Sequence, residues 1–261
     1  MNAGLIQLKS NDEIDIMRRA NAVVAEVLEI CREHAKPGIT TGDLDRLAAE
    51  HLQRRGAGSA FLGYHGYPKH LCTSVNHRVV HGIPSDDEVL EEGDIVSCDF
   101  GAVVDGYVGD SAKTFAVGEV SQEAKTLMDV TRRALEAAIE VCRPGNRLRD
   151  IGGAVEDVVA PYGFGIVRDY VGHGIGRKMH EAPQVPNYRT RGRESALRLR
   201  PGLVIAIEPM INLGTHECIV LDDGWTVETA DGKLSAHFEH SVAITEKGPF
   251  VLSDPDAPDP R

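Results

Sequence analysis

The sequence predicts an α+β protein built from two related halves. Segments with a helical period of apolar residues alternate with β-rich segments, and one order of motifs occurs twice along the chain. The chain has 261 residues, of which 42% are apolar and 26% are charged, so it is long enough for a large buried core. No apolar run approaches the roughly 18 residues of a membrane-spanning helix. The composition therefore indicates a soluble globular protein with no membrane partner.

Four segments are predicted to be helices because their apolar residues recur at helical spacing. They cover residues 11–34, 41–54, 121–142 and 147–160. Ser10 and Glu13 form a capping-box pattern at the start of the first segment. Pro144-Gly145 follows the third segment, and such a pair is typical of a helix end.

The β-rich segments lie between and after these helices. They cover residues 94–104, 107–117, 203–212, 217–229 and 236–245. Asp105-Gly106 separates the first two segments, and this dipeptide between two apolar-rich runs is a strong signal for a β-hairpin.

The repeated order of motifs runs helix, Pro-Gly, helix, His-Gly-Ile, Gly, strand and carboxylate. In the first copy Asp99 follows Gly93 by six positions, and in the second Glu208 follows Gly202 by the same number. We interpret the repeat as two halves that fold together about a pseudo-twofold axis. The alternative is coincidence among residues that commonly end helices.

These halves set the expected domain organisation. They cover about residues 12–118 and 119–250, and we expect a single domain over residues 1–252. Residues 253–261 are rich in Pro and Asp, so we expect this tail to be disordered.

The chain is strongly acidic, with 28 basic against 40 acidic residues and a net charge of −12. A field of this sign repels phosphate backbones, so DNA is not an expected partner, and it favours a cation as ligand. The exception is a basic run at residues 189–200, formed by Arg189, Arg191, Arg193, Arg198 and Arg200. We interpret this basic run as a solvated loop, with a transient RNA contact as the alternative.

The N-terminus and the cysteines bear on the compartment. The first residues lack a basic start followed by an apolar core, so no secretory signal is expected. The five cysteines are odd in number and form no CxxC motif, which favours reduced thiols. We therefore expect a cytoplasmic protein, and we expect it to be a monomer.

Five polar residues stand where a strand should be apolar or where glycines bracket a turn. They are Asp99, Asp110, His173, Glu208 and Glu239. Each has an ordinary alternative role, since an Asp caps turns and a His between glycines can be a core residue. Ionised carboxylates inside such strands are costly unless a positive charge meets them, and the core strand segments around Asp99, Glu208 and Glu239 contain no Lys or Arg. Together the five residues therefore favour a metal site.

The charge and chemistry of this set indicate which metals it would hold. Four carboxylates carry up to −4, which is too much for one divalent ion, so we expect two adjacent ions. Oxygen-rich ligands with a single nitrogen suit Mn²⁺, Fe²⁺ or Co²⁺ better than structural Zn²⁺, which prefers several Cys or His.

Four motifs around these residues are specific in combination. They are AspPheGlyAlaValValAspGlyTyrValGlyAspSer (99–111), GlyHisGlyIleGly (172–176), IleGluProMet (207–210) and PheGluHis (238–240). Over about residues 10–252 the chain resembles the type I methionine aminopeptidases in their short bacterial form. The resemblance implies the pita-bread fold, in which helices cover a central curved antiparallel sheet. It also implies removal of the initiator methionine from nascent polypeptides when the second residue is small.

The resemblance further implies roles for single residues. The five polar residues would bind two metals, with Asp110 and Glu239 bridging them. Glu208 would shuttle the proton from water to the leaving amine, His180 would donate to the carbonyl oxygen, and His81 would meet the scissile nitrogen. The methionine pocket would be lined by Tyr64, Tyr67, Cys72, Trp225, Phe61 and Met179, with His81 and His180 contacting the substrate. Phe61 and Met179 depart from the residues common in the family, where a smaller residue, often Cys, and an aromatic residue stand.

Two other functions are weaker alternatives. Proline-specific aminopeptidases and creatinases are related enzymes, but they usually carry a sizeable N-terminal domain, for which the helix predicted from residue 11 would leave no room. A catalytically inactive relative that binds proteins or RNA would have lost metal ligands, and all five are present. No nucleophile-elbow or cysteine-protease context supports a Ser or Cys nucleophile.

Overall fold

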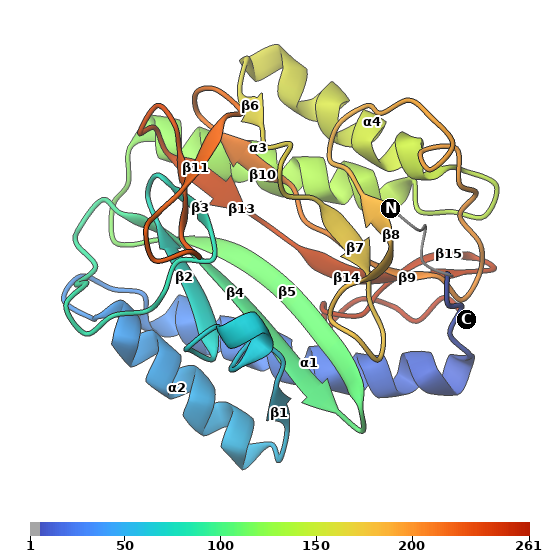
Figure 1. The fold of residues 1–261 in the computed structure, drawn as a ribbon, viewed down its shortest axis with the longest axis horizontal. Coiled ribbons are helices and arrows are strands. Elements are labelled where there is room, and N and C mark those ends of the chain that lie inside the picture. The colour runs from blue at the N-terminus through green and yellow to red at the C-terminus, as the bar shows by residue number, and fades with distance from the viewer. Residues whose placement is uncertain (1–5) are drawn as a thin grey trace.

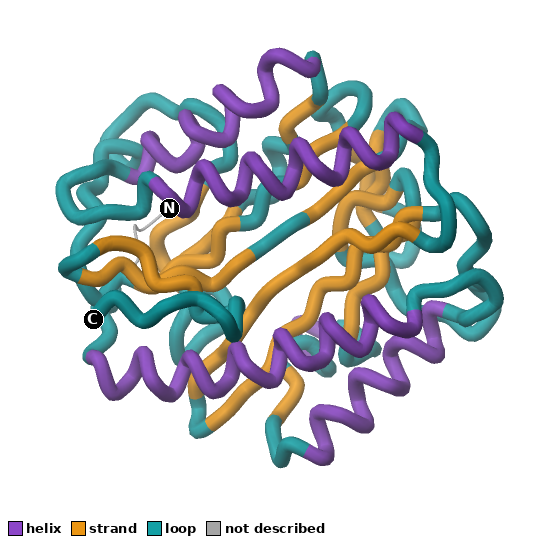
Figure 2. Tube along the Cα trace, turned by 180° about the vertical axis from the view of Figure 1, so that it is seen from behind, coloured by secondary structure: helices purple, strands orange, loops and turns teal. Residues whose placement is uncertain are grey.

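Two pairs of helices cover one side of the strands in the structure, a computed structural model that describes residues 6–261. Figure 2 shows the two pairs on the side facing the viewer, one above and one below the long strands. The helices are α1 (Asn11–His34), α2 (Thr41–Arg54), α3 (Gln122–Glu140) and α4 (Leu148–Val159). The four predicted helices are therefore confirmed, and Ser10 and Glu13 form the predicted capping box at the start of α1.

The strands within the described residues form four antiparallel sheets (Figure 1). One sheet contains β1 (Gly58–Ser59), β2 (Leu71–Val75), β4 (Ile95–Val104) and β5 (Tyr107–Ala116). A second contains β15 (Gly248–Val251), β14 (His240–Thr245), β9 (Val204–Ile207), β7 (Gly172–Gly174) and β8 (Glu181–Val185). Two small sheets contain β13 (Ser235–His237), β10 (Met210–Asn212) and β6 (Gly165–Ile166), and β11 (Cys218–Val220), β12 (Val227–Thr229) and β3 (Arg78–Val80). The connections include two short 3₁₀ helices, η1 (Tyr64–Gly66) and η2 (Ala160–Tyr162).

The predicted hairpin is confirmed as β4 and β5. Its two loop residues both adopt positive φ, 49° at Asp105 and 77° at Gly106. Such a two-residue turn matches the right-handed twist of the flanking strands, which is why Asp-Gly favours it.

Three of the predicted β-rich segments each contain two strands with a break between them. The segment 203–212 is broken at Glu208-Pro209, because proline has no N–H that could donate a hydrogen bond to a neighbouring strand. The segment 236–245 is broken at Phe238-Glu239, because the Glu239 N–H donates to Ala112 of β5 instead. The two breaks face each other, since Met210 pairs with His237 on one side and Ile207 with His240 on the other.

The segment 217–229, predicted to be β-rich, is the pair β11 and β12 with a turn between them. The Asp223 carboxylate accepts hydrogen bonds from the N–H groups of Trp225 and Thr226, each at 2.8 Å. This local bonding reverses the chain, and it places the only tryptophan of the sequence in the turn.

The core is divided in the same way as the helices. One buried cluster lies under α3 and α4, another lies under α1 and α2, and a third joins residues of both halves, such as Ile14 and Val204. This packing supports the interpretation of two related halves in one domain, which stays a prediction.

The C-terminal segment 253–261, for which we expected disorder, forms neither helix nor strand and lies against α1. The guanidinium of Arg18 donates to the carbonyl of Asp254 at 2.6 Å, and Arg261 pairs with Asp15 of the same helix. These contacts give an acidic, proline-rich segment a defined place despite its composition. No helix within residues 6–261 is long and apolar enough to cross a membrane.

Candidate active site

The β4–β5 hairpin presents two carboxylates on one face. The register pairs Asp99 of β4 with Ala112 of β5, and Asp110 of β5 with Gly101 of β4. Residues opposite each other, and residues two apart on one strand, point to the same face of a sheet. Asp99 and Asp110 are therefore diagonal neighbours whose side chains face the same way.

The second half of the chain supplies three more polar side chains. His173 is the central residue of β7, and Glu208 directly follows β9. Glu239 lies in the break before β14, where its N–H donates to the Ala112 carbonyl at 2.8 Å and its carbonyl accepts from Ser111 Oγ. These two bonds join the backbone of Glu239 to the strand that carries Asp110, so the two halves of the chain meet at the carboxylates.

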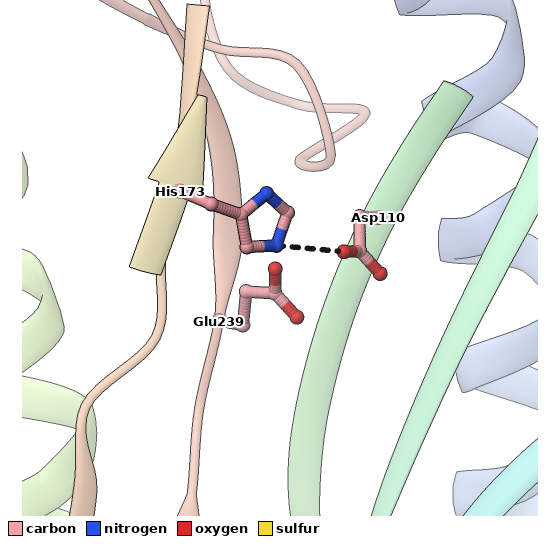
Figure 3. A group of neighbouring side chains, drawn as sticks. All are labelled: Asp110, His173 and Glu239. Atoms are coloured by element: carbon pink, nitrogen blue, oxygen red, sulfur yellow. Dashed lines mark ion pairs between the residues drawn. The ribbon is translucent and has the colours of Figure 1, made fainter. Parts of the chain in front are cut away.

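The five predicted metal ligands converge in one cavity. His173 Nε2 lies 3.6 Å from Asp110 Oδ2 and 3.5 Å from Glu208 Oε1. Figure 3 shows Asp110, His173 and Glu239 pointing toward one another, and one ligand atom from each lies within 4.8 Å of the others. Asp99 and Glu208 line the same cavity beside this group.

The ring of His173 is oriented as a metal ligand requires. Its Nδ1 lies 2.9 Å from the carbonyl oxygen of Gly174, which can only accept, so Nδ1 carries the proton. Burial, with His180 nearby, lowers the pKa of His173 to about 3, so the imidazole is neutral near pH 7. The Nε2 lone pair then faces carboxylate oxygens, an arrangement that a cation between them would make favourable.

The carboxylates are held away from water and near one another. Burial raises the pKa of Asp99 to about 7. Burial and then the charge of Asp99 raise the pKa of Asp110 well above its usual value. Burial, followed by the charge of Asp110, does the same to the pKa values of Glu208 and Glu239.

Unsatisfied oxygens show that a cation fits this site. Asp99 Oδ1, Asp110 Oδ1 and Glu239 Oε1 are buried, and none has a hydrogen-bond partner. Buried polar atoms without partners are rare and costly in folded proteins. Four carboxylates and one neutral imidazole are a donor set for divalent cations that prefer oxygen, and up to four negative charges match two such ions.

The same cavity, of about 490 Å³, also contains every predicted pocket residue. These residues are Phe61, Tyr64, Tyr67, Cys72, His81, Met179, His180 and Trp225. Tyr67 is held by hydrogen bonds from its hydroxyl to the carbonyls of Leu71 and Gly82, both at 3.0 Å, and its ring meets Trp225 edge-on at 5.1 Å. One side of the cavity is therefore aromatic and apolar, and the other carries the carboxylates.

Two further histidines lie between the apolar side and the carboxylates. His180 Nδ1 lies 2.7 Å from the hydroxyl of Tyr64, and its ring lies 4.3 Å from that of His173. His81 adopts a positive φ of 61°, which is uncommon for a residue with a side chain and often marks a functional site. Burial lowers the pKa of His81 to about 4.

Several cavity residues were missed from the sequence. His65, Val80, Tyr170 and Val171 also line the cavity, and each is a near neighbour in sequence of a residue that was predicted.

His237, which lies beside Glu208, was also missed from the sequence. Its buried Nε2 has no hydrogen-bond partner and lies 3.9 Å from Glu208 Oε2. It precedes Glu239 by two positions, and two residues that far apart on an extended chain share a face. That spacing was a usable signal.

Comparison with known proteins places the chain among metallopeptidases. The family model for metallopeptidase family M24 matches residues 15–246. The methionine aminopeptidase of Clostridium acetobutylicum is 48% identical over 249 residues, which cover 95% of this chain and 99% of that protein. The methionine aminopeptidase of Escherichia coli strain K12 is 44% identical, covering 95% of this chain and 94% of that protein.

Solved structures agree with the sequence comparison. The methionine aminopeptidase from Thermotoga maritima matches with a TM-score of 0.93 at 45% identity, over 96% of this chain and all, 100%, of that chain. The prolidase from Pyrococcus furiosus matches with a TM-score of 0.74 at 23% identity, which shows a shared fold alone. The predicted α+β pita-bread fold and the resemblance to methionine aminopeptidases are confirmed. The chain belongs to metallopeptidase family M24.

Proposed function

We propose that this chain removes the N-terminal methionine from nascent proteins and peptides by hydrolysing their first peptide bond. The observation that supports this most directly is the shared cavity, in which an aromatic, apolar side faces a cluster of carboxylates and histidines. The apolar side suits an unbranched thioether side chain, and the polar side suits a cation-dependent hydrolysis.

The metal centre is proposed to be formed by Asp99, Asp110, His173, Glu208 and Glu239. Two divalent cations held there, with Asp110 and Glu239 shared between them, would lower the pKa of a bound water and polarise the scissile carbonyl. The oxygen-rich donor set favours Mn²⁺, Fe²⁺ or Co²⁺.

The remaining steps fall to side chains of the cavity. Glu208 accepts the proton from the attacking water and delivers it to the leaving amine, because its carboxylate lies beside the other ligands and faces the cavity. His180 donates a hydrogen bond to the carbonyl oxygen as negative charge develops there. His81 contacts the scissile nitrogen from the opposite, aromatic side.

Substrate selection follows from the same cavity. The methionine side chain is proposed to lie among Phe61, Tyr67, Cys72, Met179 and Trp225. The second residue of the substrate then lies near Tyr64 and His81 and at the edge of Phe61, where a small side chain fits and a large one clashes. Peptides that begin with methionine followed by Gly, Ala or Ser are the expected substrates.

We further propose that the protein acts as a cytoplasmic monomer and that the basic run at 189–200 is a solvated loop, with a transient contact to the ribosome as the alternative. The contact would be made by the basic run at 189–200. Arg189 is already paired with Glu156 and Asp157 of α4, at 2.9 Å and 2.7 Å. The contact would therefore fall mainly to the other four arginines of the run.

Hydrolysis of two tripeptides and one dipeptide tests the proposed function. The purified protein, supplied with Mn²⁺ or Co²⁺, should cut Met-Ala-Ser rapidly and Met-Lys-Ser far more slowly. A dipeptide of the form Xaa-Pro, which a proline-specific relative would cleave, should remain intact. Cleavage of Xaa-Pro in preference to Met-Ala-Ser would contradict the proposal, as would no cleavage of any peptide by a protein shown to hold metal.

A further inference from the structure

A buried lysine outside the cavity connects two segments that carry cavity residues. Lys9 Nζ lies 2.6 Å from Glu181 Oε2, and the two side chains are only 4% and 5% exposed. The N–H of Lys9 donates to the carbonyl of Gly202 at 2.7 Å. Neither Lys9 nor Glu181 lines the cavity.

Glu181 closes the turn that brings His180 into the cavity. We call residues 176–181 the His180 turn. Glu181 directly follows His180, and its second oxygen, Oε1, accepts from the N–H of Lys178 at 3.2 Å. The turn thereby presents Met179 and His180 to the cavity. The buried ammonium group of Lys9 forms an ion pair with the carboxylate that stabilises this turn.

The other end of the link is the strand that leads to Glu208. Gly202 lies two residues before β9 (Val204–Ile207), and Glu208 follows that strand directly. Through its backbone and its side chain, Lys9 therefore bridges the start of this strand and the end of the His180 turn. The distance between His180 and Glu208 depends on how these two segments lie relative to each other.

The side chain of Lys9 packs closely against the His180 turn, and its backbone packs closely against the segment that leads to β9. A Cβ on Gly176 would collide with the Cε of Lys9, and a Cβ on Gly202 would lie 2.8 Å from the Lys9 carbonyl oxygen. The beginning of the His180 turn has its own restraints, because Gly176 accepts from the N–H of Val108 at 2.8 Å. The end of the turn, next to His180, is held by the pairing of Glu181 with Gly174 of β7 and by the Lys9–Glu181 ion pair.

Stability alone does not account for this pair. Removing two charges from water is costly, and apolar residues of similar size often replace a buried ion pair without loss of stability. Such residues would fill the space but would not fix the direction of the turn. We propose that Lys9 is a positioning residue for His180, holding the His180 turn in register with the strand that leads to Glu208. This proposal rests on the hydrolytic role given to His180 above.

Two variants separate positioning from stability. Lys9→Met leaves the buried Glu181 carboxylate without its cationic partner, so both the melting temperature and kcat should fall. Adding Glu181→Leu removes that charge, so the melting temperature should return to near the wild-type value. The kcat of the double variant should stay about tenfold or more below wild type, with a much smaller change in KM, because a slightly misplaced His180 loses its alignment. A purely structural pair would recover stability and kcat together.

A spectroscopic readout tests the position of His180 without activity. In metal-free protein the ¹⁵N shifts of the His180 ring should report one tautomer in the wild type, because Tyr64 bonds to Nδ1. In the double variant these shifts should move toward the average of the two tautomers. An inactive wild type would contradict the proposed function and leave this measurement able to decide on Lys9.

The control is Arg132→Met with Glu136→Leu. This double variant removes an exposed ion pair on α3 and should change neither kcat nor the ring shifts. Wild-type kcat, or wild-type ring shifts, in the Lys9 and Glu181 double variant would overturn the proposal. If that variant does not fold, Glu181→Asp keeps the charges and shortens their reach; lowered kcat with altered shifts supports the proposal, and wild-type values of either overturn it.

Discussion

The hydroxyl of Tyr64 lies 2.7 Å from Nδ1 of His180. Burial raises the pKa of Tyr64 and lowers that of His180, so both groups are neutral near pH 7. A neutral imidazole has one donor and one acceptor nitrogen. When the phenol donates to Nδ1, the ring proton stays on Nε2, which is the donor that a developing oxyanion needs.

Tyr64→Phe should therefore lower kcat by about tenfold while changing KM less, because the ring is kept and the tautomer is released. Steady-state kinetics with Met-Ala-Ser would measure both constants. Tyr162→Phe, which removes an exposed hydroxyl that contacts Arg133, is the matched control and should behave as wild type. An unchanged kcat in Tyr64→Phe would mean that the hydroxyl does not set the tautomer.

Glu208→Gln should abolish turnover, because an amide cannot accept the proton of water and is a weaker metal ligand than a carboxylate.

His180→Ala should lower kcat by about 10² or more, because the donor to the developing charge is lost. Circular dichroism should show that both proteins remain folded. Rates near wild type in either variant would refute the role given to that residue.

The helices and the hairpin could be predicted because their signals are local. The capping box at Ser10 and the Asp105-Gly106 turn each depend on a few adjacent residues. The breaks in the later strands could not be predicted in this way. The N–H of Glu239 donates to Ala112, which comes from the other half of the chain. Only the folded arrangement shows that partner.

Part of the candidate site could be predicted because its signals are also local in the sequence. Asp99 and Glu208 stand out locally as carboxylates in apolar strands, and the order of motifs around them occurs twice. The link from Lys9 to Glu181 spans 172 positions and carries no local signal. The tail at 253–261 has the composition of a disordered segment, and its place against α1 depends on Arg18, far away in sequence.

Removal of divalent metal should abolish activity, because the bound cations would supply both the lowered pKa of water and the polarisation of the scissile carbonyl. Protein dialysed against EDTA, with its metal content measured, should be inactive toward Met-Ala-Ser. Mn²⁺, Fe²⁺ or Co²⁺ should restore turnover at micromolar concentration or below. Full activity in protein shown to lack metal would contradict the proposed centre.

Asp99 should make the metal-free protein less stable as the pH rises. Its pKa is raised by burial from 3.8 to about 7, so the folded state binds this proton more tightly than the unfolded state. The stabilising contribution is complete below about pH 4 and is lost as the pH rises through 7. The free energy of unfolding of wild type, minus that of Asp99→Asn, should therefore fall by up to about 4 kcal/mol over this range. Urea denaturation of both metal-free proteins measures it, and a difference independent of pH would be the contrary result.

Phe61 should sharpen the selection of the second substrate residue. Its side chain is 7% exposed, meets Tyr67 edge-on at 6.5 Å and packs against Gly101, so it has little freedom to move aside. Phe61→Ala should open space and raise kcat/KM for Met-Val-Ser relative to Met-Ala-Ser, although loss of a buried ring should also cost about 3 kcal/mol of stability. Leu62→Ala changes an exposed neighbour and should leave the ratio unchanged. The two peptides are compared for wild type and both variants below the melting temperature of each protein. An identical ratio in all three would exclude Phe61 from substrate selection while leaving the methionine pocket itself in place.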